Sequence, residues 1–225
     1  MEKIQVSAQG REIDVEVYAP SSDGPAPGIL LLHELFGLLD CYREDAQDLA
    51  DRGYLVYLPN LFTGGARKYC VRAMVSAAAR ENRSSAGPNQ EVHDLLDTLK
   101  FDKRCNGRLG MIGMCLTGGF VLHMAKREDM DAPVIYHHSL GLKGAGVPKN
   151  DSLGEIRLLQ GHWSKIDPFC PAKRRNQLIN ELGDRVEAHV YDMPHGFRSV
   201  SRRMKASAVV WDRTLDFFER QLMSA

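Results

Sequence analysis

Residues 111–119, MIGMCLTGG, place a cysteine where an apolar run gives way to small residues. The run before Cys115 is typical of a buried strand, and Gly113, Gly118 and Gly119 flank the cysteine. Glycines suit a sharp strand-to-helix turn, in which backbone segments approach closely and the residue at the tip is strained. A cysteine in an apolar stretch can also be a small packing residue. The flanking glycines favour a nucleophile at a helix N-terminus, where free N–H groups stabilise a thiolate.

The rest of the chain alternates strand and helix patterns. Short apolar runs typical of strands buried on both faces occur at Gly28–Glu34, Tyr54–Asn60, Arg108–Gly113, Ala132–His138, Ile156–Gly161 and Val186–Tyr191. Helical patterns occur at Tyr42–Arg52, Lys68–Arg83, Asn89–Phe101, Leu116–Arg127, Pro171–Leu182 and Lys205–Leu222. The alternation predicts an α/β fold with a mostly parallel sheet flanked by helices on both faces. The alternating stretch EIDVEVYAP predicts an antiparallel edge hairpin at the N-terminus.

Length and composition favour one α/β domain over residues 1–225. The chain has 225 residues, of which 44% are hydrophobic, enough for a full core. Lys plus Arg equal Asp plus Glu, 29 against 29, so no overall field attracts nucleic acid or an acidic membrane. We therefore expect a small-molecule substrate, no nucleic acid or membrane partner, and a monomer or small homo-oligomer.

Cysteine usage and the N-terminus indicate a cytoplasmic protein. The five cysteines are an odd number, widely spaced, and no pair has metal-ligand spacing. This pattern argues against a disulfide framework and against a zinc site. The opening MEKIQVSAQG has no apolar core of a signal peptide, and no run approaches the roughly 20 apolar residues that span a bilayer.

Polar residues that follow the predicted strands are the candidates for chemistry, because parallel sheets bind ligands outside the carboxyl ends of their strands. Cys115, Asp167 and His195 each follow such a strand, in the nucleophile, acid, histidine order of an α/β-hydrolase triad. Taken alone, Asp167 could equally cap the helix that begins near Pro171, and His195 could be a solvated surface histidine. Their joint placement favours the triad.

The turn after the strand at residues 28–34 offers two further groups. Glu34 is a carboxylate directly after an apolar run, where a charge requires a partner unless it is exposed. The backbone N–H groups of Leu35, in the same turn, and of Leu116 could form an oxyanion hole for an acyl-transfer intermediate.

The motifs HELFG, GMCLTGG, KIDPFCP and PHGF, with the closing RTLDFFERQL, resemble the dienelactone hydrolase family from about Pro27 onward. The resemblance implies a single α/β-hydrolase domain with a Cys115–Asp167–His195 triad. It also implies that Glu34 partners the resting thiol, and it supports Leu35 and Leu116 at the oxyanion positions.

The activity implied by the resemblance is hydrolysis of enol-lactones such as carboxymethylenebutenolide during the breakdown of aromatic compounds. The thiolate would attack the lactone carbonyl, the ring would open to give an acyl-enzyme, and water would release the product. No metal and no organic cofactor is implied.

The sequence departs from the family pattern at several positions. Thr117 stands where the elbow usually has a glycine. Arg67 and Arg198 are the nearest candidates for holding a substrate carboxylate, although neither aligns without a shift. His137 and His138 replace in part the tyrosines expected after their strand, and we expect them to point to opposite sides, with one lining the pocket.

Three functions are therefore weighed. The first is hydrolysis of a lactone or activated ester with a small anionic acyl part. The second is a general carboxylesterase or thioesterase with another substrate. The third, from a different class, is a non-catalytic binding module or thiol redox sensor in which Cys115 is oxidised. Retention of the whole triad favours the first two.

Overall fold

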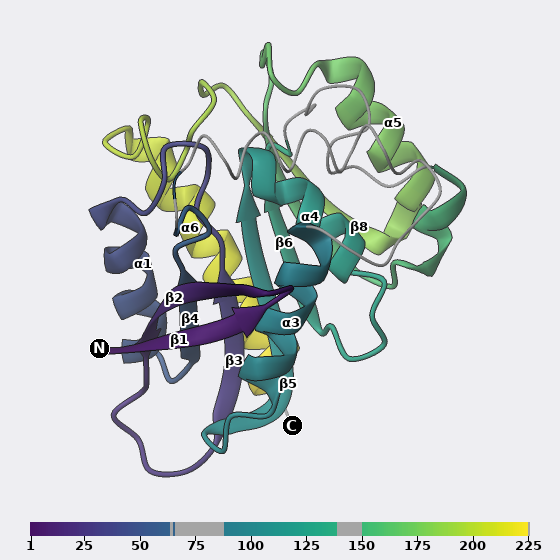
Figure 1. Ribbon diagram of the computed structural model, residues 1–225. Helices are drawn as coiled ribbons and strands as arrows, with labels where there is room; N and C mark the ends of the chain where they lie inside the picture. The colour runs from purple at the N-terminus through teal and green to yellow at the C-terminus, as the bar shows by residue number, and fades with distance from the viewer. Residues whose placement is uncertain (64, 66–87, 139–149, 225) are drawn as a thin grey trace.

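The computed structural model describes residues 1–63, 65, 88–138 and 150–224, and within these ranges the chain forms an eight-stranded sheet (Figure 1). The strand order is β1-β2-β4-β3-β5-β6-β7-β8. β1 pairs with β2 and β2 pairs with β4 in antiparallel fashion, and all other neighbours are parallel. The predicted mostly parallel sheet with an N-terminal antiparallel hairpin is confirmed. The strands are β1 (Glu2–Ala8), β2 (Arg11–Tyr18), β3 (Ala26–Leu31), β4 (Leu55–Pro59), β5 (Cys105–Met114), β6 (Ala132–Tyr136), β7 (Leu159–Ser164) and β8 (Val186–Tyr191).

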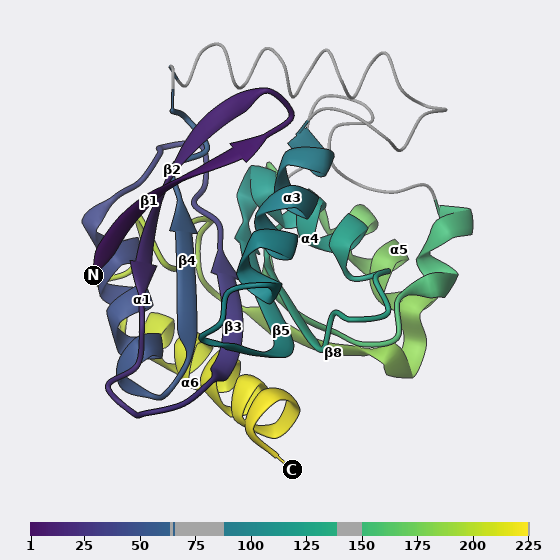
Figure 2. The ribbon, with the colours of Figure 1, turned by 60° about the horizontal axis from the view of Figure 1, so that its bottom comes forward.

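Helices cover both faces of the sheet, as Figure 2 shows from a second direction. One face packs against α1 (Asp40–Asp51) and α6 (Lys205–Phe218), and the other against α3 (Pro88–Lys100), α4 (Gly118–Met124) and α5 (Ala172–Leu182). Successive residues of one strand serve opposite faces, since Ile29 belongs to the α1 and α6 cluster and Leu30 to the other. Burial on both faces explains the unbroken apolar runs.

Several element boundaries differ from the prediction. The strand expected at Ile156–Gly161 is β7, three residues later, because a 3₁₀ turn at Asn150–Glu155 precedes it and Ile156 is buried in the connection. The expected C-terminal helix ends in a π-helical turn at Glu219–Met223. The expected helix at 68–83 lies outside the described residues.

Five parallel strands, β3, β5, β6, β7 and β8, end at the same edge of the sheet. Because the loops that leave this edge carry Glu34, Cys115, His137, Asp167 and His195, the topology gathers these residues from distant parts of the sequence. In the described ranges, no helix is long and apolar enough to cross a bilayer.

Trp163 fills the space beside Gly161 on β7, and this packing provides a test of the core. A Cβ atom at Gly161 would lie 2.0 Å from the Trp163 ring, which is fully buried. Gly161→Ala should lower the free energy of unfolding by about 1–3 kcal/mol, because the indole must shift within a packed core. Urea unfolding followed by tryptophan fluorescence measures the change. Gly154→Ala is the control, since a Cβ there meets nothing within 4 Å; equal stability of the two variants would contradict this packing.

Candidate active site

Cys115 sits at the tip of a strained turn between β5 and α4. Its φ angle is +55°, in the left-handed region that costs an ordinary residue roughly 1–2 kcal/mol. The turn is tight, since a Cβ atom at Gly113 would lie 2.5 Å from the carbonyl oxygen of Thr117. The chain then passes through a 3₁₀ turn, Cys115–Thr117, into α4. This geometry is the sharp strand-to-helix elbow expected from the glycines.

Thr117 has a role that a glycine at its position could not fill. Its buried hydroxyl accepts a hydrogen bond from the Met114 N–H at 2.8 Å and donates one to the Met114 carbonyl at 3.0 Å. The side chain therefore ties the start of the helix to the end of the strand. The close contact between backbone segments occurs one residue later, at Gly118, where a Cβ atom would lie 2.9 Å from the Cα of His138.

Asp167 orients His195 and also caps its own loop. One carboxylate oxygen, Oδ2, accepts a hydrogen bond from Nδ1 of His195 at 2.7 Å. The other, Oδ1, accepts the N–H groups of Phe169 at 2.8 Å and Cys170 at 3.1 Å. Asp167 therefore partners His195 with one oxygen and closes a turn within its loop with the other. The expectation that it caps the helix near Pro171 is wrong, because α5 begins at Ala172 without a side-chain cap and the bonds of Oδ1 go to the residues before it.

The surroundings of His195 favour its protonated form. Burial alone would lower the pKa, but the hydrogen bond to Asp167 and the interaction with the Cys115 thiol raise the pKa of His195 to about 9. Burial would raise the pKa of Asp167, yet its hydrogen bond to His195 holds that pKa below the ordinary value. The three residues thus form an interacting group in which an imidazolium is favoured beside the thiol.

Glu34 is buried in the turn after β3 and held there by a histidine. His33 donates a hydrogen bond from Nδ1 to the backbone carbonyl oxygen of Glu34 at 2.8 Å. Its Nε2 accepts the backbone N–H of Leu61 at 3.1 Å. Burial lowers the pKa of His33 to about 4, so the ring stays neutral and keeps this tautomer. The carboxylate lies beside Tyr42, whose pKa is raised by burial and by the Glu34 charge. The pairing of Glu34 with the resting thiol stays a prediction.

His137 and His138 follow the end of β6, and their side chains point to opposite sides of the sheet. His137 lies against the catalytic histidine candidate, with 3.9 Å between its ring centroid and that of His195, and its Nε2 accepts the Gly196 N–H at 3.3 Å. His138 faces the other layer, where its Nδ1 accepts the Trp163 indole N–H at 3.2 Å. Of the two, the structure brings only His137 against His195.

Arg198 is not available as a free cation in the site. Its buried guanidinium is paired with Asp45 of α1, donates to the Ser207 carbonyl and lies 4.4 Å from the centroid of the Trp211 ring. This position corrects the expectation that Arg198 holds a substrate carboxylate, because the charge is already neutralised by Asp45. Arg67, the other candidate, lies outside the described residues.

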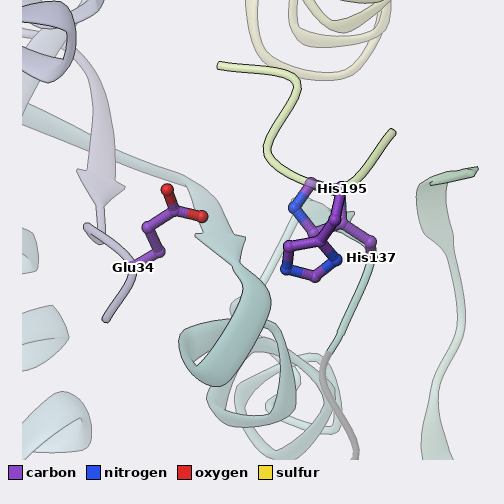
Figure 3. Close-up of side chains that lie close together, drawn as sticks. All are labelled: Glu34, His137 and His195. Carbon is purple, nitrogen blue, oxygen red and sulfur yellow. The ribbon is translucent and has the colours of Figure 1, made fainter. Parts of the chain in front are cut away.

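Glu34, His137 and His195 meet in one place, as Figure 3 shows. One carboxylate oxygen and one nitrogen of each ring lie within 4.8 Å of one another. These are residue types that could hold a cation as well as a small polar molecule.

Sequence reasoning missed His33 and Tyr42, which shape the surroundings of Glu34. A signal for His33 was present, since it directly precedes Glu34 at the end of an apolar strand. Tyr42 offered no such signal, because its position within a helix also fits a packing residue.

The sequence is similar to those of known hydrolases. The model of the dienelactone hydrolase family matches residues 13–222. A carboxymethylenebutenolidase of Rhodococcus opacus is 27% identical over 220 residues, covering 92% of this chain and 86% of the relative. A carboxymethylenebutenolidase of Pseudomonas putida is 26% identical over 228 residues, covering 94% of this chain and 92% of the relative.

Solved structures show the same fold. A dienelactone hydrolase-like promiscuous phosphotriesterase from metagenomic libraries superimposes with a TM-score of 0.75 at 18% identity, covering 98% of both chains. An alpha-beta serine hydrolase homologue from Coxiella burnetii gives a TM-score of 0.66 at 12% identity, covering 96% of both chains. The chain therefore has the α/β-hydrolase fold.

The hydroxyl of Thr117 can be tested by two substitutions. Thr117→Val keeps the shape but leaves the buried N–H of Met114 without its partner, which should lower the free energy of unfolding by about 1–3 kcal/mol. Thr117→Ser keeps the hydroxyl and should lose less stability. Chemical denaturation measures both, and a valine variant as stable as the wild type would show that the hydroxyl does not tie the elbow.

The raised pKa of His195 predicts a definite dependence on pH. Because the pKa rises from 6.5 to about 9 on folding, the associated stabilisation is fully present below pH 6.5 and is lost as the pH rises through 9. Asp167→Asn and Cys115→Ala should each lower the pKa, since each removes an interaction that raises it. NMR titration of the His195 ring protons measures these values. An unchanged pKa in Asp167→Asn would contradict the proposed origin of the shift.

Proposed function

Because the chain belongs to the dienelactone hydrolase family, we propose that it cleaves a lactone or an activated ester with Cys115 as nucleophile, through an acyl-enzyme. The observation that carries the proposal is the hydrogen bond of 2.7 Å between His195 and Asp167, beside a cysteine at a strained elbow. A histidine oriented by a carboxylate and interacting with a thiol is the arrangement that nucleophilic catalysis by cysteine requires.

The reaction would begin with attack of the Cys115 thiolate on the substrate carbonyl. The backbone N–H groups of Leu35 and Leu116 would stabilise the negative oxygen that forms. Collapse breaks the carbon–oxygen bond of the ester, and the leaving oxygen receives the proton of His195. For an enol ester the leaving group tautomerises to a ketone, which favours the forward direction. Water then releases the acid.

Because the relatives are carboxymethylenebutenolidases, carboxymethylenebutenolide, an anionic lactone, is the first candidate substrate. A binding arginine for its carboxylate would have to come from elsewhere than Arg198, which is engaged by Asp45. Arg67 stays a proposal for this role.

Exposed apolar side chains near the site support an uncharged ester or thioester as the second candidate. Phe169 is exposed, with 5.0 Å between its ring centroid and that of His195. Leu35 and Ile166, next to Glu34 and Asp167 in the sequence, are also exposed. Exposed apolar groups beside a catalytic site favour apolar ligands over charged ones.

Two variants of Cys115 test the nucleophile. Cys115→Ala should abolish hydrolysis of p-nitrophenyl acetate and dienelactone, and Cys115→Ser should lose most of it, on the order of 100-fold or more, because the site is matched to a thiol. Mass spectrometry of quenched wild-type protein should find the acyl group on Cys115. Full activity of the alanine variant would refute the proposal, and reversible oxidation of Cys115 without any turnover would favour the redox sensor.

The substrate class is distinguished by comparing matched esters. The ratio of kcat/KM for a carboxylate-bearing ester to that for a neutral ester of equal length separates the two candidates. If Arg67 binds the carboxylate, Arg67→Ala should lower this ratio about 10-fold or more, the effect of losing a charged hydrogen bond. A ratio below one in the wild type would favour the uncharged substrate.

A further inference from the structure

Three buried polar atoms that face one another at the site form no hydrogen bond of normal geometry with the described residues: Oε1 of Glu34, Nδ1 of His137 and Nε2 of His195. The Tyr42 hydroxyl beside Glu34 forms none either, and the neighbour of His195 in the free enzyme is the Cys115 thiol, which is acylated during the reaction. The three atoms come from the ends of three strands, β3, β6 and β8, and the three side chains converge (Figure 3). A buried polar atom without a partner costs about 1–3 kcal/mol, so three such atoms in one place indicate a site for a small polar ligand.

On each histidine ring, the hydrogen bond made by one nitrogen determines whether the other nitrogen carries a hydrogen. Nε2 of His137 accepts the Gly196 N–H, so its Nδ1 carries the hydrogen and is a donor. Nδ1 of His195 donates to the Asp167 carboxylate, and once the ring has given its other proton to the leaving group, as in the acyl-enzyme, Nε2 is an acceptor. Glu34 contributes a second acceptor. One donor and two acceptors are the complement of a single water molecule, which accepts one hydrogen bond and donates two.

The spacing admits a water, and the hydrogen positions favour a water over a cation. A water that makes hydrogen bonds of about 2.9 Å at tetrahedral angles holds its partners about 4.7 Å apart. Tetrahedral zinc holds its nitrogen and oxygen ligands only about 3.4 Å apart. The three groups lie within 4.8 Å of one another, a limit that both arrangements satisfy. A cation would in addition require His137 to change tautomer and give up the Gly196 N–H.

We propose that Glu34, His137 and His195 hold the water that hydrolyses the acyl-enzyme, with the Nδ1–H of His137 orienting its lone pair. This inference rests on the proposed function and adds His137 to the residues that act in deacylation. Buried waters typically make about three hydrogen bonds to otherwise unsatisfied groups, which matches this site.

The step is balanced without any further reactant. The water oxygen forms a bond to the thioester carbon while its proton passes to Nε2 of His195, and its second O–H donates to Glu34. When the tetrahedral intermediate collapses, the carbon–sulfur bond breaks, the electron pair goes to the Cys115 sulfur, and the proton on His195 protonates it. Thioester and water become acid and thiol.

The conformation of His137 suits this role. Its φ angle is +37°, a left-handed value that is uncommon for a residue with a side chain and concentrates at functional positions. Burial, together with the nearby His195, keeps its pKa well below the ordinary value, so the ring stays neutral with a single N–H. A neutral donor does not compete with His195 for the proton of the water.

His137→Phe removes the donor and keeps a ring, and His137→Asn keeps an N–H and tolerates the left-handed backbone. With p-nitrophenyl acetate in stopped flow, the phenylalanine variant should retain the fast p-nitrophenolate burst but turn over about 10-fold more slowly or worse. Mass spectrometry should show the acyl group accumulating on Cys115. The asparagine variant should recover most of the deacylation rate. His123→Phe, on the outer helix α4, controls for the exchange itself.

A second variant covers a failure of His137→Phe to fold. His137→Gly accepts the positive φ angle, and added imidazole should restore its deacylation in a saturable way, which a purely structural role would not produce. An unchanged deacylation rate in both variants, or equal loss of burst and turnover, would overturn the proposal. So would a stoichiometric metal whose removal stops deacylation. Full hydrolysis by Cys115→Ala would instead overturn the proposed function.

Discussion

The tight turn that follows β5 is the constraint on which the site depends. Cys115 adopts a left-handed backbone because the chain must reverse from the end of a buried strand into a helix packed against that strand. Gly113 leaves room for the returning backbone, and Gly118 leaves room for His138. The hydroxyl of Thr117 offsets part of the strain by joining the two sides of the turn. The cysteine is thereby displayed at the sheet edge where the other strands end.

Burial sorts the histidines around this turn into two kinds. Desolvation lowers the pKa of the buried rings, so His33, His137 and His138 remain neutral and serve as fixed donors or acceptors. His195 is the exception, because Asp167 and the thiol supply interactions that favour its charged form. The His195 ring therefore favours the protonated form, while the other three rings stay neutral, although all four are histidines.

The charged network beneath the site has a structural role. Asp45 of α1 is buried and binds both Arg198 and Arg202 from the segment after His195. Buried ion pairs of this kind hold a segment in place, because separating the two charges would leave each of them buried and unpaired. A charge that is paired in this way is not free to bind a ligand. The loop that carries His195 is thus anchored to α1.

Periodicity and chain order in the sequence alone determined the sheet, its helical layers and the strand ends that bear Cys115, Asp167 and His195. They could do so because the pattern of apolar strands and amphipathic helices depends on residues close together in the sequence. In addition, parallel strands must bring their carboxyl ends to one edge of the sheet. Only the tertiary structure decided that Arg198 pairs with Asp45, that Thr117 closes the elbow, and which way each histidine faces. Those outcomes depend on contacts between segments far apart in the chain, where packing, burial and the competing partner select one arrangement among several that the sequence allows.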